Sequence, residues 1–229
     1  MSDSEEEANE KQLKVVLMGE QMVGKTNLIK KFCFEEFSRI YVPTIGADFY
    51  VKRLSFLGNK EVTVRLTDVS GLELNGHMMA TYLFQVNIII LVYDITSHPS
   101  FDSLENWLSK IKSISPEEMV ITTFGNKCDI EHKRAVRLDR TNHFVHENKL
   151  SNYFVSAKTG ENVNSSFIEI IAKYLGMPLS SQEKDKQLSV LKVELIPKTP
   201  IVEKQVAHRN KKQTKVKQPI KSKDSCLMQ

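Results

Sequence analysis

Hydrophobic positions recur along this chain with two different spacings, and the two spacings alternate. Short apolar runs, which predict buried strands, cover residues 13–18, 86–93, 119–124 and 152–155. Apolar residues at helical spacing occur at residues 24–33, 101–114, 138–148 and 163–175, and residues 72–84 change from irregular to helical spacing. Strands that alternate with helices predict an α/β fold with a mostly parallel sheet and helices on both faces, in which ligands bind at the carboxyl ends of the strands.

Residues 49–57 and 61–67 show the strict alternation of half-buried strands, and Gly58-Asn59 between them predicts a hairpin turn. These two strands bring the sheet to six. The preceding residues 34–46 have no clear period and contain Pro43, so we expect a loop there. A loop of that length in a compact domain is usually functional.

The two ends of the chain differ from this pattern. Residues 1–11 form a polar, acidic arm, which we expect to be disordered. Residues 12–177 form the predicted domain, and residues 178–229, rich in lysine and without an aromatic side chain, predict a flexible tail. The apolar positions within residues 190–202 are the exception. Packing on the domain and binding to a partner explain them equally well.

The net charge of +4 is unevenly distributed. From Glu203 to the end, eight basic residues face two acidic ones, so this part of the tail is +6 and the remainder is −2. The basic residues are Lys204, Arg209, Lys211, Lys212, Lys215, Lys217, Lys221 and Lys223. The positive charge is therefore a property of the tail. A basic tail is exposed to solvent or binds a negatively charged partner, either nucleic acid or an anionic membrane.

Cysteine content and hydropathy indicate the compartment. Three cysteines without framework spacing favour a reducing environment over a disulfide scaffold. The acidic start lacks the features of a secretory signal, and the apolar run at residues 88–93 is far shorter than the ~20 residues of a membrane-spanning helix. We expect a cytosolic protein unless a lipid anchors it.

The strongest chemical motif follows the first strand. Gly19-x-x-x-x-Gly24-Lys25-Thr26 has the spacing of the P-loop, in which backbone N–H groups at a helix N-terminus surround phosphate oxygens. Lys25 is then expected to reach the β- and γ-phosphates, and the Thr26 hydroxyl to hold Mg²⁺. A strand and a helix flank the motif as required, so the sequence predicts a nucleoside triphosphate site.

Three further motifs follow predicted strand ends. Asp68-x-x-Gly71 supplies a carboxylate that can hold Mg²⁺ through water and a glycine N–H that can approach a γ-phosphate. Residues 126–129 read Asn-Lys-Cys-Asp, and residues 156–158 read Ser-Ala-Lys. An aspartate carboxylate accepts hydrogen bonds from guanine N1–H and its exocyclic amine, an edge that adenine lacks. Each motif alone is common, but the four in this order predict GTP/GDP as the ligand, with Mg²⁺.

These motifs resemble the Ras-like small GTPases over residues 13–176, and residues 45–49, 91–96 and 125–127 resemble the Rab branch. The resemblance implies a P-loop NTPase fold and a switch segment at residues 43–46, with Thr44 as a second Mg²⁺ ligand that also meets the γ-phosphate. Phe37 and Tyr41 are implied to flank the nucleotide. The metal set is Thr26, Thr44 and Asp68, and the catalytic set is Lys25, Thr44 and Gly71. The implied nucleotide-binding residues are Gly19, Gln21, Val23, Gly24, Lys25, Thr26, Asn27, Phe37, Tyr41, Thr44, Gly71, Asn126, Lys127, Asp129, Ser156, Ala157 and Lys158.

Three positions depart from the family pattern. Leu72 stands where relatives have the glutamine that orients the attacking water, and leucine has no group for that task. Gln21 replaces a small P-loop residue, and Thr67 replaces a tryptophan before Asp68. We expect slow intrinsic hydrolysis; the alternative is that Gln21 or a partner supplies the missing contact.

The chain ends in Cys226-Leu227-Met228-Gln229, a CaaX motif whose final glutamine predicts farnesylation of Cys226. One lipid gives marginal membrane affinity, and the basic tail supplies the second attraction. The sequence as a whole predicts a monomeric Rab-like switch on the cytosolic face of a membrane. Its expected partners are effectors, exchange factors and GTPase-activating proteins, with no nucleic acid, and the resemblance suggests vesicle trafficking in a ciliary context. The rivals are a constitutively GTP-bound binding module and a nucleic-acid-binding tail.

Overall fold

The computed structural model describes residues 11–56, 60–115 and 119–177. Six strands form one sheet in the order β2-β3-β1-β4-β5-β6. All neighbouring strands are parallel except β2 and β3, which are antiparallel. The strands are β1 Lys11–Met18, β2 Ala47–Phe56, β3 Lys60–Val69, β4 Ile88–Asp94, β5 Val120–Asn126 and β6 Ser151–Phe154.

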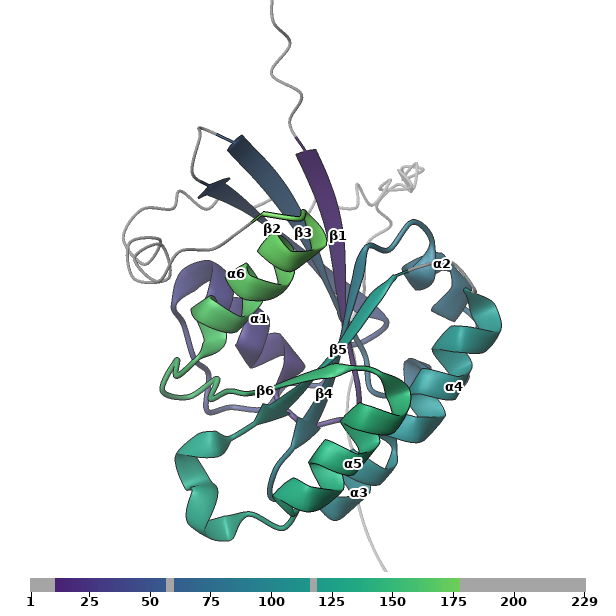
Figure 1. Cartoon of the computed structure of the whole chain (residues 1–229), viewed down its shortest axis with the longest axis vertical. Helices are drawn as coiled ribbons and strands as arrows, with labels where there is room; N and C mark the ends of the chain where they lie inside the picture. Colours follow the sequence, from purple (N-terminus) through teal and green to yellow (C-terminus); the bar gives the residue numbers. More distant parts are fainter. Residues whose placement is uncertain (1–10, 57–59, 116–118, 178–229) are drawn as a thin grey trace, which may run out of the picture. The chain divides into compact units, whose positions relative to one another are not determined.

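Helices cover both faces of this sheet, with α1 and α6 on one side and α4 and α5 on the other (Figure 1). The expected P-loop α/β architecture is confirmed. The helices are α1 Lys25–Phe34, α2 Met79–Leu83, α3 His98–Asp102, α4 Leu104–Ile114, α5 Leu138–Asn148 and α6 Val163–Tyr174, with short 3₁₀ turns η1 Glu73–Asn75 and η2 Cys128–Lys133.

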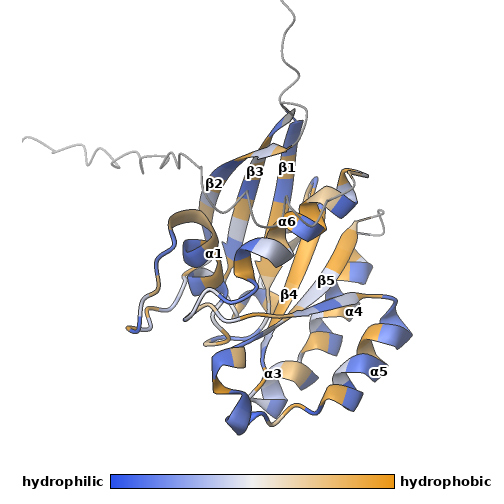
Figure 2. Ribbon diagram, turned by 60° about the vertical axis from the view of Figure 1, so that its left-hand side comes forward, coloured by the Kyte–Doolittle hydropathy of each residue, from blue (hydrophilic) through white to orange (hydrophobic). Residues whose placement is uncertain are grey.

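The alternation within β1 explains the two-sided core. Val15 and Leu17 belong to a cluster with α1 and α6, whereas Val16 and Met18 belong to a second cluster with α2 and α4. Successive side chains of a strand point to opposite faces, so one strand contributes to both cores. Strand β4 is buried at every position, and Figure 2 shows most of its length as hydrophobic. A central parallel strand covered on both faces has this composition.

Several predicted boundaries shift. Strand β1 begins at Lys11, one residue before the expected domain start, because Lys11 is in register with Val62 of β3. The helix expected at residues 101–114 is two helices that meet at Ser103. The first begins early because the Ser97 side chain accepts a hydrogen bond from the Ser100 N–H. The Gly58-Asn59 turn, the acidic arm and the tail with Cys226 lie outside the described residues.

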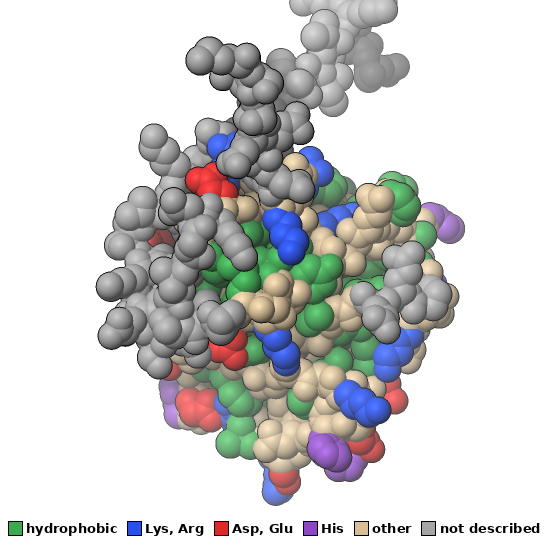
Figure 3. All heavy atoms as spheres, turned by 45° about the horizontal axis from the view of Figure 1, so that its top comes forward, with side chains coloured by type: hydrophobic (Ala, Val, Ile, Leu, Met, Phe, Trp, Pro, Cys, Tyr) green, Lys and Arg blue, Asp and Glu red, His purple; other side chains and the backbone are tan. Residues whose placement is uncertain are grey.

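The end of the sheet where β1 begins is opposite the strand ends that carry the motifs. Figure 3 shows this end, where Lys, Arg, Asp, Glu and His side chains are dispersed among hydrophobic ones in the part that grey atoms leave visible. No single charge sign dominates that visible part. Within the described residues, no helix has the length and apolar character needed to cross a membrane.

Candidate functional site

The turn between β1 and α1 depends on two glycines. Gly19 has φ +136°, and a Cβ there would lie 2.2 Å from the Val92 carbonyl oxygen of β4. Gly24 has φ +98°, and a Cβ would lie 2.4 Å from the Asn126 side-chain nitrogen. Both backbone angles lie in the region that side chains disfavour. The sequence therefore folds here into a turn that only glycine allows, and α1 starts directly after it.

Lys25, the first residue of α1, points back into this turn. Its ammonium donates to the carbonyl oxygens of Gly19 at 2.8 Å and Glu20 at 2.7 Å. Burial lowers the pKa of Lys25 to about 8, and the charges of Asp68 and Glu20 oppose that shift. A cation so held is costly to bury unless an anion pairs with it, and a phosphate group would supply that partner.

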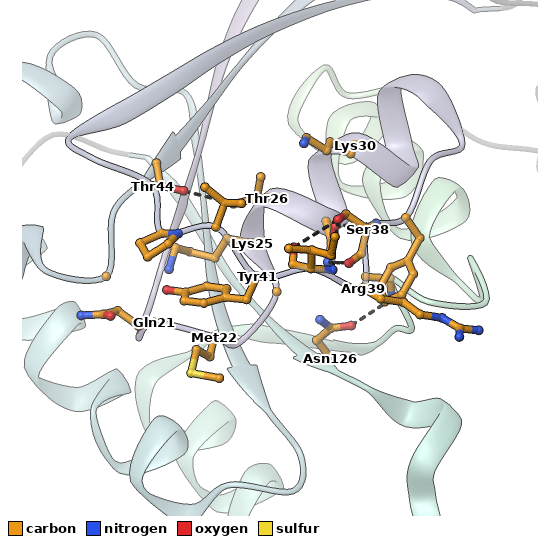
Figure 4. A pocket seen from close by; sticks show the side chains of 18 of the residues that line it. Gln21, Met22, Lys25, Thr26, Lys30, Ser38, Arg39, Tyr41, Thr44 and Asn126 are labelled. Atoms are coloured by element: carbon orange, nitrogen blue, oxygen red, sulfur yellow. Dashed lines mark hydrogen bonds between the residues drawn. The ribbon is translucent and has the colours of Figure 1, made fainter.

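Two threonine hydroxyls meet one carboxylate beside Lys25. Asp68 Oδ2 accepts from the Thr26 hydroxyl at 2.5 Å and from the Thr44 hydroxyl at 3.0 Å. The two hydroxyl oxygens are 3.2 Å apart, and the side chains point toward each other in Figure 4. Burial raises the pKa of Asp68, while its hydrogen bond from Thr26 opposes the rise. Three segments distant in sequence, α1, residues 35–46 and β3, thus converge.

The Asp68 carboxylate has the properties expected of a Mg²⁺ ligand. Asp68 is fully buried, and its second oxygen, Oδ1, has no hydrogen-bond partner among the described residues. A buried carboxylate oxygen left unpaired is costly. Hydroxyl and carboxylate oxygens are the ligand types that Mg²⁺ prefers, directly or through water. The donor set of Thr26, Thr44 and Asp68 therefore fits the ion expected from the sequence.

Residues 35–46 form the wall over this centre and contain neither helix nor strand. Asn27 anchors the segment, because its carboxamide donates to the Ser38 carbonyl at 2.9 Å and accepts from the Ser38 N–H at 3.2 Å. At the other end, the Gly46 carbonyl accepts from the Ser70 N–H at 2.8 Å. Phe37, just before Ser38, and Tyr41, between the two anchors, line the pocket. Asn27 thus holds the wall rather than presenting a free carboxamide to the cavity.

Asn126, the last residue of β5, connects two loops. Its side-chain nitrogen donates to the Val23 carbonyl at 2.8 Å, and its side-chain oxygen accepts from the Ala157 N–H at 3.0 Å. Both polar ends of the buried carboxamide are therefore used. Through these two hydrogen bonds Asn126 ties the P-loop to the loop after β6.

Asp129 and Lys127 lie beyond Asn126. Asp129 Oδ1 accepts from the Ser156 hydroxyl at 2.7 Å, and Oδ2 is 3.4 Å from the Lys158 ammonium. Lys127, at φ +72°, pairs with Asp94 Oδ2 at 2.6 Å. Ser156 is fully buried and fixes the Asp129 carboxylate from behind. An aspartate held this way presents acceptors suited to guanine.

These groups surround one cavity of about 470 Å³, within the usual size range for small-ligand pockets. Of the residues expected to bind nucleotide, those that line it are Gln21, Gly24, Lys25, Thr26, Asn27, Phe37, Tyr41, Thr44, Gly71, Asn126, Lys127, Asp129, Ala157 and Lys158. Gly19, Val23, Asp68 and Ser156 are not in the lining. They shape it from behind, through the turn and the hydrogen bonds just described.

The lining also includes residues that sequence reasoning missed: Met22, Lys30, Ser38, Arg39, Asp48, Tyr50 and Ile130. Lys30 had a usable sequence feature, since it lies one helical turn after Thr26 on α1 and shares its face. The others belong to loops, to β2 or to the 3₁₀ turn η2, where spacing does not reveal which side chains meet a cavity.

Gly71 lies directly against the P-loop. A Cβ at Gly71 would be 2.4 Å from the Gln21 backbone nitrogen. The following Leu72 is 72% exposed and makes no side-chain hydrogen bond. The aspartate-to-glycine motif is thus closely packed where expected, and the residue after it offers only an apolar side chain.

Comparison with known proteins agrees with this geometry. Residues 14–175 match the model of the Ras family. The chain is 32% identical over 200 residues to the Ras-related protein Rab-28 of Caenorhabditis elegans, an alignment that covers 85% of this chain and 80% of that protein. It is 33% identical over 174 residues to the Ras-related protein Rab-3 of the same organism, covering 76% and 79% respectively.

Proposed function

This chain belongs to the Ras family of small GTPases, and we propose that it is a Rab-like switch whose GTP hydrolysis is slow. The observation that supports this most is the convergence of Lys25, Thr26, Thr44 and Asp68 at one end of a cavity, with the Asp129 carboxylate also in its lining. The first group suits a Mg²⁺-bound triphosphate, and the second suits guanine.

Hydrolysis is attack by water on the γ-phosphorus with departure of GDP. The Lys25 ammonium stabilises charge on the phosphate oxygens, and the backbone around Gly24 surrounds them. Bound Mg²⁺, held through Thr26, Thr44 and Asp68, would neutralise part of that charge. Thr44 and Gly71 stand on the segments that contact the γ-phosphate, so loss of that phosphate removes their shared ligand.

Those two segments are the proposed switch. Residues 35–46 have no regular structure, and residues 70–84 contain only the short η1 and α2. Irregular backbone with few internal hydrogen bonds rearranges at low cost. GTP would order both segments, and the ordered surface would recruit effectors, whereas exchange factors and GTPase-activating proteins would act on the transition.

The proposal that hydrolysis is slow is based on Leu72. Its side chain is exposed and cannot orient water, and an arginine supplied by a partner does not replace that role. A second candidate function follows from the same residue: a constitutively GTP-bound binding module in which hydrolysis is negligible. The two differ only in whether bound GTP turns over.

For the tail we propose farnesylation of Cys226 and attachment to the cytosolic face of a membrane, with a cytosolic pool. A CaaX ending after a lysine-rich stretch supports this. Similarity to Rab proteins further supports a role in vesicle trafficking, and we extend it to a ciliary or basal-body compartment. We propose a monomer that does not bind nucleic acid.

The first experiment is to purify the protein, extract its bound nucleotide, and follow single-turnover GTP hydrolysis with Mg²⁺ for the wild type and Leu72→Gln. We expect guanine nucleotide, slow turnover in the wild type, and acceleration of about tenfold or more in Leu72→Gln. Wild-type GTP that does not decay would favour the binding module. Absence of bound guanine nucleotide, with no binding on addition, would refute the proposed function.

A further inference from the structure

An ion pair joins the ends of two neighbouring strands beside the pocket. Asp94 is the last residue of β4 and is in register with Asn126, the last residue of β5. Lys127 follows Asn126, and its ammonium lies 2.6 Å from Asp94 Oδ2. Lys127 lines the pocket, whereas Asp94 is not in the lining. The pair therefore connects a residue of the nucleotide site to a carboxylate that belongs to none of the four nucleotide motifs.

The Asp94 carboxylate is itself held in place. Its Oδ1 accepts hydrogen bonds from the Thr96 N–H at 2.8 Å and from the Thr96 hydroxyl at 2.7 Å. The Asp94 N–H donates to the Ser100 hydroxyl at 3.0 Å, and the side chain is 10% exposed. Thr96 thus occupies one carboxylate oxygen, and the other meets Lys127. Because charge-assisted hydrogen bonds are short and strong, the Lys127 ammonium has a defined position.

The backbone of Lys127 is constrained as well, since its φ of +72° lies in the region that side chains disfavour. Figure 4 shows the preceding Asn126 on the side of the cavity near Arg39 and away from Thr44. Lys127 therefore belongs to the end of the pocket opposite the proposed Mg²⁺ ligands, together with Asp129. With its backbone and its ammonium both fixed, the aliphatic stem between them has a fixed course at the end suited to guanine.

We propose that Asp94 is a positioning residue for nucleotide retention: it anchors the Lys127 ammonium so that the aliphatic stem of Lys127 covers the face of the bound base. This rests on the proposed guanine-nucleotide function. An anchored stem adds apolar contact area, whereas a free ammonium is strongly hydrated and its stem is flexible. Every base presents a similar ring face, so base identity is left to Asp129. Asp94 thus controls how long a nucleotide stays bound rather than which base is bound.

Asp94→Asn tests the anchor, because the amide keeps the oxygen that Thr96 holds and removes the charge that Lys127 meets. We expect fluorescent GDP, chased with excess GDP in the presence of Mg²⁺, to leave about tenfold faster than from the wild type. Fluorescent inosine diphosphate should leave faster by the same factor, because hypoxanthine presents the same ring face. An unchanged rate for GDP, or an acceleration confined to GDP, would overturn the proposal.

A double-mutant cycle separates the anchor from a general role of Asp94 in the loop. In a Lys127→Ala background there is no ammonium to position, so Asp94→Asn should cause no further acceleration of GDP release. Acceleration of the same size in both backgrounds would overturn the proposal, since Asp94 would then act without Lys127. Asp102→Asn removes an ion pair to Arg140 on the outer helices and is the matched control, expected to release GDP at the wild-type rate.

Two substitutions of Lys127 test the same pair while leaving Asp94 intact. The Lys127 side chain is 34% exposed, so both variants should fold. Lys127→Arg keeps a cation for the carboxylate and should release GDP within about threefold of the wild type, whereas Lys127→Met keeps only the stem and should release it about tenfold faster. Equal rates for the two variants would contradict the anchor. A wild type that binds no fluorescent GDP would instead contradict the proposed function, so the two failures are distinguishable.

Discussion

At the scale of single residues, the ligand preference of the site depends on which of its polar atoms already have a hydrogen-bond partner within the protein. Asp68 uses one oxygen for two hydroxyls, and its other oxygen is buried with no hydrogen-bond partner in the part of the chain that the structure describes. Lys25 is a buried cation whose ammonium donates to two P-loop carbonyl oxygens. Burying a charge or a polar atom without a matching partner costs free energy. A ligand of opposite charge would offset this free-energy cost. We therefore expect phosphate to bind at the Lys25 ammonium and Mg²⁺ at the Asp68 carboxylate.

Asp68→Asn tests the metal role directly. The amide keeps the shape of the side chain but removes its charge, so the Mg²⁺ concentration needed to retain bound nucleotide should rise by about 10- to 100-fold. Nucleotide release during Mg²⁺ titration with a chelator measures this midpoint. Asp102→Asn is the control, because Asp102 pairs with Arg140 on the outer helices. An unchanged midpoint in Asp68→Asn would show that the metal is held elsewhere.

Cys33 gives a prediction that depends on pH. Burial raises the pKa of its thiol from 9.0 to about 12, against the lowering effect of Lys52. In a variant with Cys128→Ser and Cys226→Ser, native Cys33 should resist iodoacetamide at pH 8 and react once urea unfolds the chain. Because the folded state holds this proton more tightly, the stability it contributes is full below pH 9 and declines as pH rises toward 12. Rapid labelling of the native protein would contradict the burial.

At the scale of elements, the helices act mainly as supports that position loops. Helix α4 buries Leu104, Trp107, Leu108 and Ile111 on one face, as its spacing predicts. Trp107 is fully buried, yet its indole N–H has no hydrogen-bond partner among the described residues. Part of the stability from burying this ring is therefore offset by an unpaired donor.

This offset predicts an unequal response to two core substitutions. Trp107→Phe should cost about 1 kcal/mol or less, because it removes the unpaired donor together with some packing. Ile111→Ala, which only creates a cavity, should cost about 2–5 kcal/mol. Urea unfolding of the nucleotide-saturated protein, followed by circular dichroism, measures both, with the exposed Asn106→Ala as control. A larger cost for Trp107→Phe would mean that its N–H is satisfied.

At the scale of the whole molecule, charge separates the domain from the tail. The net charge of +6 after residue 202 and the CaaX cysteine lie in one short stretch, while the rest of the chain is slightly acidic. Lysines near an anionic leaflet add at most about 1 kcal/mol each, and one prenyl chain binds only marginally. Neither contribution alone gives stable attachment, so the two are expected to act together.

Cys226→Ser should therefore move the protein from the membrane pellet to the soluble fraction of cell lysates, because the lysines alone bind weakly. Ser225→Ala, which leaves the CaaX cysteine intact, should stay with the membranes. Retention of Cys226→Ser in the pellet and its release by nuclease would instead support a nucleic-acid-binding tail.

The sequence by itself determined the order of strands and helices, the P-loop and the family, because these depend on short-range spacing. A strand, a glycine turn and a helix start are encoded within residues 13–33. Boundaries moved where contacts other than periodicity intervened, as where the Ser97 side chain caps α3 and where Lys11 pairs with Val62 of β3.

Only the tertiary structure decided which side chains share a partner. Asp68 between Thr26 and Thr44, Asn126 between Val23 and Ala157, and Gln21 against Gly71 all join residues from different strands and loops. Their proximity results from how parallel strand ends meet at one edge of the sheet. Motif spacing brings the right residues to that edge, but the distances that assign roles arise only when the sheet is assembled.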